Sequence, residues 1–343
     1  MALQDIIPSS VMTAITNEGK MVFHTVGDTG GIMDATPQLL VANEMENDFQ
    51  NPPKSLSDNP VFFYHLGDVI YFKGEAANYY PQFYEPYQHY PAPIVAIPGN
   101  HDGIPSDPNT PSLQAFMRNF CSPLPTHSAD AVDATRTTMT LPNVYWTFDT
   151  PFATIIGWYT NTPDHGELDD QQIQWLTSEL KAAPSKRALI VAMHHPIFSA
   201  DTVHSGSQYL EKVLNDAVAA SKRFPDLVLT AHVHNYQRFT RVAGKRQIPY
   251  IVAGAGGYHN LHYVAKVNGQ NMATPAQGPE PGVTLEHYVD NRHGFLRLEV
   301  TNTIITGTYF VAPRPQEPWR GTPTLADKFT LDWTANQLVP LQP

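Results

Sequence analysis

Five short runs of hydrophobic residues recur along the chain, and each is bounded by residues that favour turns. A strand with one exposed face would alternate between hydrophobic and polar residues, whereas these runs are almost continuously hydrophobic. The pattern predicts buried strands in a sheet that is covered on both faces by helices. The predicted strands are Met21–Val26, Val61–Leu66, Pro93–Ile97, Arg187–Met193 and Asp226–Thr230.

Two helices are predicted after the third and fourth of these strands. The stronger signal covers Gly166–Lys181, where Asp169 can cap the first turn and Trp175 is expected to pack. The second helix is predicted over Gln208–Lys222. Hydrophobic residues at helical spacing form one stripe in the first helix: Ile173, Leu176 and Leu180.

The remaining sequence predicts further strands and long loops. Alternating or β-branched residues predict antiparallel strands over Gly294–Thr301 and Ile304–Phe310, which would belong to a second sheet. Stretches rich in Pro, Gly and Asn are expected to form surface loops: Glu46–Asn59, Gly103–Pro111 and Lys266–Gly282. We interpret the whole as one α/β domain.

Composition limits the chemistry that this fold can carry. With 42% hydrophobic and 11% aromatic residues, the chain of 343 residues is globular. Its single cysteine, Cys121, excludes an intrachain disulfide and a thiolate metal cluster, so metal ligands must be oxygen and nitrogen atoms. The net charge of −11 argues against a general nucleic-acid surface. An acidic protein that handles phosphate must concentrate positive charge locally, and metal ions do this.

The sequence also bears on location. No hydrophobic run reaches the roughly 18 residues of a membrane span. The first 20 residues lack a basic flank followed by a long hydrophobic stretch, so no signal peptide is expected. The chain is therefore expected to be cytoplasmic, or to be the mature form of an exported protein, without a membrane partner.

Clusters of possible ligands follow or adjoin all five strands. Open α/β sheets bind ligands beyond the carboxyl ends of their strands, so these loops can converge on one site. Carboxylates, a carboxamide oxygen, imidazoles and a phenolate suit hard or borderline cations. Any one cluster alone is more typical of a turn or a core histidine than of a ligand. The clusters are Gly27-Asp-Thr-Gly30, Gly67-Asp-Val-Ile-Tyr71, Gly99-Asn-His-Asp102, His194-His-Pro196 and Ala231-His-Val-His234.

Together, the five clusters resemble the motifs of the calcineurin-like metallophosphoesterases, and most closely those of the purple acid phosphatases. The motifs Gly-Asp-x-Gly, Gly-Asp-x-x-Tyr, Gly-Asn-His-Asp/Glu, Val-x-x-His and Gly-His-x-His occur here in order over residues 27–234. The one departure is Ala231 for glycine. The resemblance implies a four-layer α/β/β/α sandwich with two mixed sheets flanked by helices, as a single domain over residues 1–343. Because the first motif begins at residue 27, the N-terminal β-sandwich domain of plant relatives is not expected.

The resemblance also implies two adjacent metal ions that share Asp68 as a bridging carboxylate. The first site, expected to hold Fe(III), would be completed by Asp28, Tyr71 and His234. The second site, expected to hold Zn, Mn or Fe(II), would be completed by Asn100, His194 and His232. The reaction implied is in-line attack of a metal-bound hydroxide on the phosphorus of a small-molecule phosphate ester.

Tyr71 is the ligand that separates purple acid phosphatases from the wider superfamily. Other members use a histidine in the first motif where this chain has Gly30, and Tyr71 is available as its substitute. A phenolate needs a strongly acidic cation to stay deprotonated near neutral pH, and Fe(III) is such a cation.

Three further residues receive catalytic roles from the resemblance. His101 matches the phosphate-contacting histidine, and Asp102 is placed to orient its ring. His204, ten residues after His194, lies where relatives keep a histidine that protonates the leaving group. This assignment rests on loop spacing, and an exposed loop histidine is its alternative.

Other residues near the motifs are assigned from position alone. Side chains alternate at a strand end, so His195 is expected to pack or to hydrogen-bond behind the ligands. The residues expected to line the pocket are Tyr236, Arg238, the turn Gly254–Gly257, Tyr258 and His259.

Three functions stay open at this point. The leading one is an acid phosphomonoesterase of purple acid phosphatase type. A phosphodiesterase or nucleotide pyrophosphatase could use the same metal centre, because only the walls of the pocket would differ. A non-catalytic binding module of the same fold is the third, and the presence of all seven inferred ligands argues against it. The alcohol of the ester, the second metal and the oligomeric state are left open.

Overall fold

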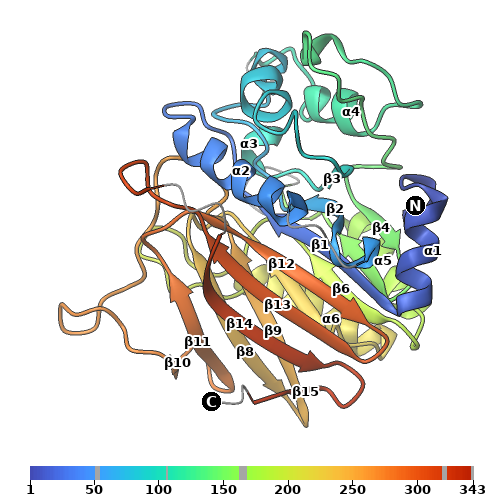
Figure 1. Cartoon of the computed structure of the whole chain (residues 1–343). Helices are drawn as coiled ribbons and strands as arrows, with labels where there is room; N and C mark the ends of the chain where they lie inside the picture. The colour runs from blue at the N-terminus through green and yellow to red at the C-terminus, as the bar shows by residue number, and fades with distance from the viewer. Residues whose placement is uncertain (51–54, 106, 162–167, 319–322, 341–343) are drawn as a thin grey trace.

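The computed structural model describes residues 1–50, 55–105, 107–161, 168–318 and 323–340. Within these residues, fifteen strands form two mixed sheets that pack face to face, with helices on the outer faces (Figure 1). This is the four-layer α/β/β/α arrangement that the resemblance implies.

The seven-stranded sheet has the order β15-β14-β13-β12-β1-β2-β3. The pairs β1–β2 and β2–β3 are parallel, and the other pairs are antiparallel. Its parallel half therefore brings three carboxyl ends to one edge. The strands are β1 Lys20–Val26, β2 Pro60–His65, β3 Ile94–Ala96, β12 Gly294–Thr301, β13 Ile304–Val311, β14 Thr324–Asp332 and β15 Gln337–Leu338.

The eight-stranded sheet has the order β10-β11-β8-β9-β7-β6-β5-β4. Its central strands β5, β6, β7 and β9 pair in parallel, and antiparallel strands flank them. The strands are β4 Trp146–Asp149, β5 Ala153–Gly157, β6 Ala188–Ala192, β7 Leu227–Thr230, β8 Tyr236–Ala243, β9 Arg246–Ala253, β10 Ala276–Gln277 and β11 Val283–Val289.

Helices cover the outer face of each sheet. Helices α1 and α2 contact the seven-stranded sheet, and α5 and α6 pack against the eight-stranded sheet. The α-helices are α1 Ser9–Glu18, α2 Thr36–Gln50, α3 Asn100–Gly103, α4 Gln114–Phe120, α5 Asp170–Ala182 and α6 Gln208–Ser221. Short helical turns are Leu3–Asp5, Leu56–Asp58, Ala76–Asn78, Tyr80–Tyr84 and Ala129–Ala131. None of the helices among the described residues has the length and hydrophobicity to cross a membrane.

The five predicted strands are found as β1, β2, β3, β6 and β7, but they are divided between the two sheets. One sheet covered on both faces by helices was therefore the wrong expectation. The runs are continuously hydrophobic because one face of each strand packs on the other sheet and the opposite face packs under helices. In β6, for example, Ile190 lies in the core shared by the sheets, and Val191 lies in the core beneath α5 and α6.

Most of the other local predictions agree with the structure. Helix α5 begins after Asp169, whose Oδ1 accepts from the Gln172 amide at 2.7 Å, and α6 follows its prediction closely. Residues 166 and 167 of the predicted helix lie outside the described residues. Trp175 packs against the Tyr145 ring, and β12 and β13 pair antiparallel as expected.

The predicted loop over residues 46–59 is partly wrong. Helix α2 extends to Gln50, and a helical turn covers 56–58, while residues 51–54 lie outside the described part. The helix forms because Val41, Ala42 and Met45 are buried on one face. The polar Gln38 and Glu44 are buried as well. The predicted loop over 266–282 contains only the short strand β10, and 103–111 is largely irregular where it is described.

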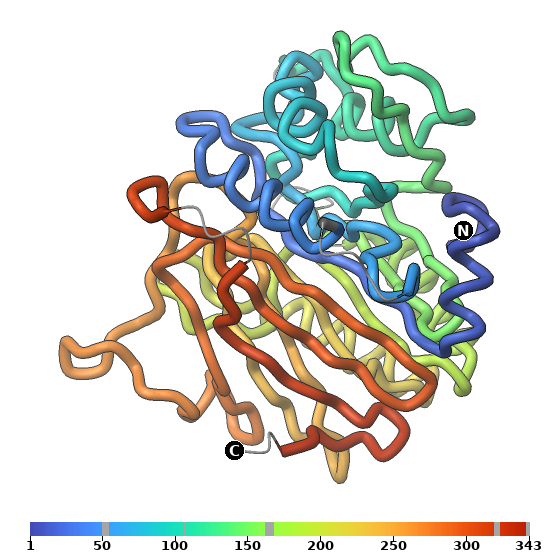
Figure 2. Tube along the Cα trace, viewed as in Figure 1, coloured from blue at the N-terminus to red at the C-terminus, as the bar shows by residue number. Residues whose placement is uncertain are grey.

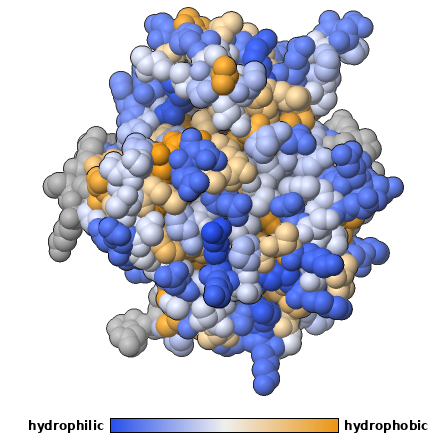
Figure 3. Space-filling model, turned by 90° about the vertical axis from the view of Figure 1, so that its right-hand side faces the viewer, coloured by the Kyte–Doolittle hydropathy of each residue, from blue (hydrophilic) through white to orange (hydrophobic). Residues whose placement is uncertain are grey.

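The chain between about residues 70 and 140 gathers over one end of the sheets, and α3 lies at that end (Figure 2). On the face shown in Figure 3, hydrophilic residues (blue) and intermediate residues (white) surround patches of hydrophobic residues (orange). Most of the orange patches lie in the upper half of this view. The loops that follow β1, β2 and β3 lead into the end that this segment covers.

Candidate metal centre

Loops that follow β1, β2, β6 and β7 meet through backbone hydrogen bonds. The Asp28 amide donates to the Gly67 carbonyl at 3.0 Å, and the Ala231 amide donates to the His194 carbonyl at 2.9 Å. The ring of His194 in turn donates from Nδ1 to the Leu66 carbonyl at 2.8 Å. The convergence expected from the strand ends is therefore found.

Two glycines allow these loops to approach closely. A Cβ on Gly67, which has φ 95°, would lie 2.6 Å from the Gly99 nitrogen and 2.8 Å from the His194 Nδ1. A Cβ on Gly27 would lie 2.6 Å from the Cβ of Ala231. The one departure from the family motifs, Ala231, is tolerated because residue 27 has no side chain.

Three of the predicted ligands hold the backbone in the left-handed region. Their φ angles are 57° at Asp28, 51° at Asp68 and 65° at His232. This region is costly for residues other than glycine, and such strain gathers at functional sites. All three lie at turns that leave the end of a strand, where the unusual backbone aims the side chain inward.

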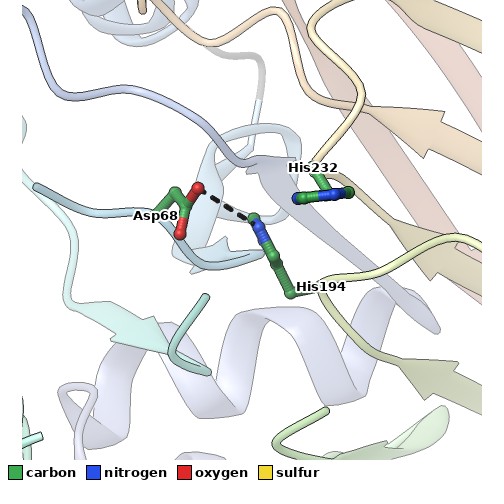
Figure 4. A group of neighbouring side chains, drawn as sticks. All are labelled: Asp68, His194 and His232. Atoms are coloured by element: carbon green, nitrogen blue, oxygen red, sulfur yellow. Dashed lines mark ion pairs between the residues drawn. The ribbon is translucent and has the colours of Figure 1, made fainter. Parts of the chain in front are cut away.

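Asp68, His194 and His232 form the centre of the site. Their possible ligand atoms all lie within 4.8 Å of one another, and the Asp68 Oδ2 is 3.3 Å from the His194 Nε2. Figure 4 shows the His194 ring directed at the Asp68 carboxylate, with the His232 ring beside it. The Oδ2 of Asp68 is buried and forms no hydrogen bond with the part of the chain that the structure describes. A buried carboxylate oxygen without a partner fits a metal ion as its missing neighbour.

The second predicted site brings Asn100 to the same place. Its Oδ1, at the first residue of α3, is 3.1 Å from the His194 Nε2. Because the His194 Nδ1 is used by the Leu66 carbonyl, Nε2 is the atom that faces this site. Burial, followed by the neighbouring histidines, lowers the pKa of His232 well below its usual value, which favours the neutral ring that a metal requires.

The first predicted site gathers Asp28, Tyr71 and His234. The Tyr71 hydroxyl donates to the Asp28 Oδ1 at 3.0 Å and lies 3.4 Å from the His234 Nε2. That Nε2 is 3.6 Å from the same Asp28 oxygen, while the Nδ1 donates to the Asn260 carbonyl. Two oxygens and one nitrogen therefore face a common point, as a hard cation requires.

The structure explains why Gly30 and Tyr71 occur together. A Cβ on Gly30 would lie 2.9 Å from Cδ2 of the Tyr71 ring and would overlap the Gln82 Oε1. A histidine at residue 30 and a tyrosine at residue 71 therefore exclude each other sterically. Burial, followed by Asp28 and Asp68, raises the pKa of Tyr71 well above its usual value. Only a strongly acidic cation would hold this phenol deprotonated.

The Asp68 carboxylate and the His194 ring each favour the charged form of the other. Burial opposes ionisation of Asp68, yet His194 and His101 lower the pKa of its carboxyl below the usual value. Burial also opposes protonation of His194, but Asp68 and Asp28 raise the pKa of its ring. Two buried carboxylates thus require positive charge beside them, which is the condition that a metal centre meets.

His101 and Asp102 lie at the site but do not contact each other as expected. The His101 amide donates to the Asp68 Oδ1 at 2.8 Å, and its Nδ1 donates to the Phe72 carbonyl at 2.6 Å. The Asp102 carboxylate instead accepts from the amides of Val69, at 3.1 Å, and Gly99, at 2.8 Å. Asp102 therefore joins the second and third motif loops, and the expectation that it orients the His101 ring was wrong.

The histidines behind the ligands pack as a group. The His204 ring lies 4.4 Å from the His232 ring, so this loop histidine is at the site. Partial burial, followed by His262 and His234, lowers the pKa of His204. The His195 ring lies 4.4 Å from the His232 ring, and its Nδ1 is 2.7 Å from the Thr160 hydroxyl, which confirms the packing and hydrogen-bonding role expected for it.

The predicted pocket-lining residues fall into two groups. Tyr258 stacks on the Tyr71 ring at 4.0 Å, and its neighbour His259 lies 4.6 Å from it and is exposed. The Gly254–Gly257 turn packs on the first motif, because a Cβ on Gly254 would lie 2.7 Å from the Asp28 Oδ2.

Tyr236 and Arg238 do not line the site, which corrects the second group. Both side chains bind Asp327 on β14, Tyr236 through its hydroxyl at 2.8 Å and Arg238 through two hydrogen bonds at 2.7 and 3.0 Å. Tyr236 also stacks on Tyr309 at 3.9 Å. These residues join the two sheets.

Sequence reasoning missed Asp201 and His262. The His262 ring is 5% exposed and lies 4.3 Å from the His234 ring and 5.1 Å from the His204 ring. The Asp201 carboxylate lies 3.3 Å from the His262 Nδ1. Neither residue belongs to a motif, and the only signal was the position of Asp201 in the loop that carries His204.

Comparison with known proteins supports the same family. A model of the family described as calcineurin-like phosphoesterase matches residues 21–236. Purple acid phosphatase 21 of Arabidopsis thaliana is 25% identical over 215 residues, which are 60% of this chain and 43% of that protein. A protein of Vibrio vulnificus named as a 3′,5′-cyclic adenosine monophosphate phosphodiesterase is 29% identical over 144 residues, or 40% of this chain and 42% of that protein.

A solved structure shares the fold. The purple acid phosphatase PPD1 from yellow lupin seeds (Lupinus luteus) aligns with a TM-score of 0.63 at 15% identity, over 91% of this chain and 54% of that one. The matched regions thus span about half, or less, of the length of these relatives.

Proposed function

The chain belongs to the calcineurin-like phosphoesterase family, and from this premise we propose that it is a metal-dependent hydrolase of small phosphate monoesters that uses two metal ions. One observation carries the proposal: donor atoms from loops at the ends of the strands face a common buried point around Asp68. The buried Asp68 Oδ2 has no hydrogen-bond partner among the described residues, which supports a bridging position for this carboxylate.

The chain's own residues would hold and separate the two ions. Asp28, Tyr71 and His234 would bind the first ion, and Asn100, His194 and His232 would bind the second, with Asp68 between them. When bound, two such ions lower the pKa of a coordinated water and neutralise charge on phosphoryl oxygens. The protein would contribute a rigid donor set, because glycines and left-handed turns fix the loops that carry the donors.

Fe(III) is the proposed ion of the first site, and Zn, Mn or Fe(II) the proposed ion of the second. The support is the buried Tyr71 phenol, whose pKa is raised by burial, Asp28 and Asp68. A phenol in this environment becomes a good ligand only for a strongly acidic cation. The second donor set has one carboxamide oxygen and two imidazoles besides Asp68, which suits divalent ions.

Two histidines are proposed to act on the substrate. The His101 ring lies 4.5 Å from the Tyr71 ring, tilted by 45°, and the Phe72 carbonyl orients it, so it is held beside the first site for contact with the phosphoryl group. His204 lies against His232, where it can protonate the leaving oxygen. Asp102 would act indirectly, because it holds the loops of Asp68 and Asn100 together.

A phosphodiesterase on the same centre is the second candidate. The relative from Vibrio vulnificus is named for cyclic adenosine monophosphate phosphodiesterase activity, and the metal ligands alone do not select between esters with one or two organic groups. A binding module without catalysis is disfavoured, because it would have no need to keep a complete donor set.

The test is substitution of the bridging carboxylate. Asp68→Asn keeps the size of the side chain but removes its charge, so metal occupancy and nearly all turnover should be lost. A matched control is Asp216→Asn on α6, which removes an exposed carboxylate that pairs with Lys212. Retention of both ions and more than about a tenth of the wild-type rate, a barrier change below ~1.4 kcal/mol, would exclude the bridging role.

The ester preference is read in the same assay. Initial rates on 4-nitrophenyl phosphate and bis(4-nitrophenyl) phosphate, at equal metal loading, compare monoester with diester. We expect the larger kcat/KM for the monoester. A larger value for the diester would replace the monoesterase proposal with the second candidate.

A further inference from the structure

Asp201 is a buried charged residue outside the metal centre. Its side chain is fully buried, in the loop between β6 and α6 that carries His204. The Oδ2 accepts from the amides of Val203 and His204, both at 2.9 Å, and the Oδ1 accepts from the Asn235 side chain at 3.3 Å. Although burial opposes it, His262 and these amides lower the pKa of the Asp201 carboxyl below its usual value.

His262 lies between this carboxylate and the metal ligands. Its Nδ1 is 3.3 Å from the Asp201 Oδ2, and its amide donates to the His234 carbonyl at 3.0 Å. The His262 carbonyl accepts from the Asn235 side chain, also at 3.0 Å. Its ring packs on the rings of both His234 and His204. His262 therefore touches a predicted ligand on one side and the predicted proton donor on the other.

Backbone pairing holds the two segments together. The Thr202 amide donates to the Tyr263 carbonyl at 3.1 Å, the Ala265 amide donates to the Ala200 carbonyl at 2.8 Å, and Asp201 forms a β-bridge with Val264. The loop that carries His204 is thus fastened to the segment that carries His262.

A simpler explanation of Asp201 is a turn. An aspartate commonly accepts from amides two and three residues ahead, and this needs neither burial nor a partner on another segment. A buried charge is costly unless several groups compensate for it. The contacts with Asn235 and His262 are the part that a turn leaves unexplained.

We propose that Asp201 and His262 are positioning residues that hold the His204 ring against the metal centre, on the side where the leaving group departs. The proposal rests on the proposed function, in which His204 protonates the leaving oxygen. Proton transfer requires hydrogen-bond reach in the reacting complex, so a His204 ring that is free to rotate would donate less effectively.

The effect should depend on the leaving group. Loss of groups that orient a functional side chain typically lowers activity by about 10- to 100-fold. A phenolate leaving group needs the proton, whereas a 4-nitrophenolate departs with much less help. Asp201→Ala and His262→Ala should therefore slow phenyl phosphate by about this factor and 4-nitrophenyl phosphate by far less, with both metal ions retained.

The experiment compares kcat for the two esters in five variants of the full chain. Besides Asp201→Ala and His262→Ala, these are His204→Ala, the double variant Asp201→Ala/His204→Ala, and Asp201→Asn. Asparagine keeps one acceptor for the turn but removes the charge near His262. The control Thr202→Val, in the same loop as Asp201, keeps the backbone pairing with Tyr263 and removes the hydroxyl that also donates to the Tyr263 carbonyl.

The positioning role predicts that Asp201→Asn keeps most of the defect, that the double variant is no slower than His204→Ala, and that Thr202→Val resembles the wild type. Full recovery in Asp201→Asn, equal losses on both esters, or additive losses in the double variant would reduce Asp201 to a turn or a folding role. A leaving-group effect in His204→Ala without one in Asp201→Ala would overturn this inference and leave the proposed function intact.

A second readout does not depend on turnover. In protein labelled with ¹³C-histidine and loaded with diamagnetic Zn(II) in place of iron, the His204 ring signal, identified by its absence in His204→Ala, should shift and broaden in Asp201→Ala and His262→Ala. An unchanged signal would overturn the positioning role even if the wild type hydrolyses neither ester, and that inactivity by itself would overturn only the proposed function.

Discussion

Gly99→Ala should damage the proposed metal centre through a single added methyl group. Gly99 precedes Asn100 at the start of α3, and its φ of −94° suits any residue, so backbone strain is not the issue. A Cβ at this position would overlap the Oδ1 and the backbone nitrogen of Asp68 and would lie 2.7 Å from its Cγ. Neither the backbone nor the buried carboxylate can yield without moving the second motif.

The size of the effect follows from that overlap. Carbon atoms pack at about 3.5–4.0 Å, so Asp68 must move by about 1 Å. Overpacking of this kind costs about 1–3 kcal/mol of stability, whereas a misplacement of about 1 Å at a reacting centre costs on the order of 100-fold in rate. Activity should therefore fall far more than stability does.

Gly244→Ala is the matched control. Gly244 lies in the turn between β8 and β9 with φ 64°, and a Cβ there would meet no atom of the described residues within 4 Å. Its cost should be about 1 kcal/mol of backbone strain, with no change at the site.

Urea unfolding, metal content and kcat on 4-nitrophenyl phosphate should be measured for both glycine variants. We expect comparable losses of stability, but loss of metal and about 100-fold slower turnover only in Gly99→Ala. If Gly99→Ala kept both ions and the wild-type rate, Asp68 would not be held where this account requires.

Three further substitutions test separate parts of the account. Tyr71→Phe should abolish the visible absorption expected of a ferric phenolate and weaken iron binding, and a colourless, iron-free wild type would contradict the Fe(III) proposal. Asp327→Asn should lower the free energy of unfolding by about 3 kcal/mol with metal content unchanged, because Arg238 loses its buried partner. Burial opposes ionisation of Asp327, but Arg238 lowers the pKa of its carboxyl in the folded protein. In urea titrations, the stability that this ion pair contributes should therefore be fully present above the pKa of the unfolded carboxyl and lost as pH falls through the lower pKa of the folded one. A difference in unfolding free energy that does not change with pH would contradict this. Asp169→Ala should cost about 1 kcal/mol through the lost cap of α5, as urea unfolding would report, and should leave turnover unchanged.

Local patterns were sufficient to predict the strands that carry the site. Each motif joins a buried strand to a turn residue and a ligand, and these relations span only a few residues. The positions of Asp68 and Asn100 at the ends of β2 and β3 follow from them. The same residues converge in the structure because parallel strands present their carboxyl ends at one edge.

The division of the strands between two sheets was not predictable from the runs themselves. A residue such as Ile190, which packs on the other sheet, is as hydrophobic as Val191, which packs under helices. A buried position favours a hydrophobic residue whether a sheet or a helix covers it, so the runs do not show which layer packs on each face. The helical end of α2 was missed because its polar residues resemble a loop.

Contacts between distant segments account for the errors at the site. Arg238 was expected at the pocket because it follows the last motif closely, but its partner Asp327 lies 89 residues away on another sheet. Asp201 and His262 were missed for the same reason, since neither stands in a motif and they meet only through the pairing of two loops. Predictions based on spacing fail where the partner comes from another layer.

The number of metal ions bound per chain tests the central claim most directly. Native mass spectrometry of the purified protein, after reconstitution with iron and zinc and removal of excess metal, should show the mass of two ions per chain in the wild type. Both should be lost or weakened together in Asp68→Asn, because one carboxylate bridges them. A wild type that binds one ion or none, or an Asp68→Asn variant that keeps both, would contradict a two-metal centre built around Asp68.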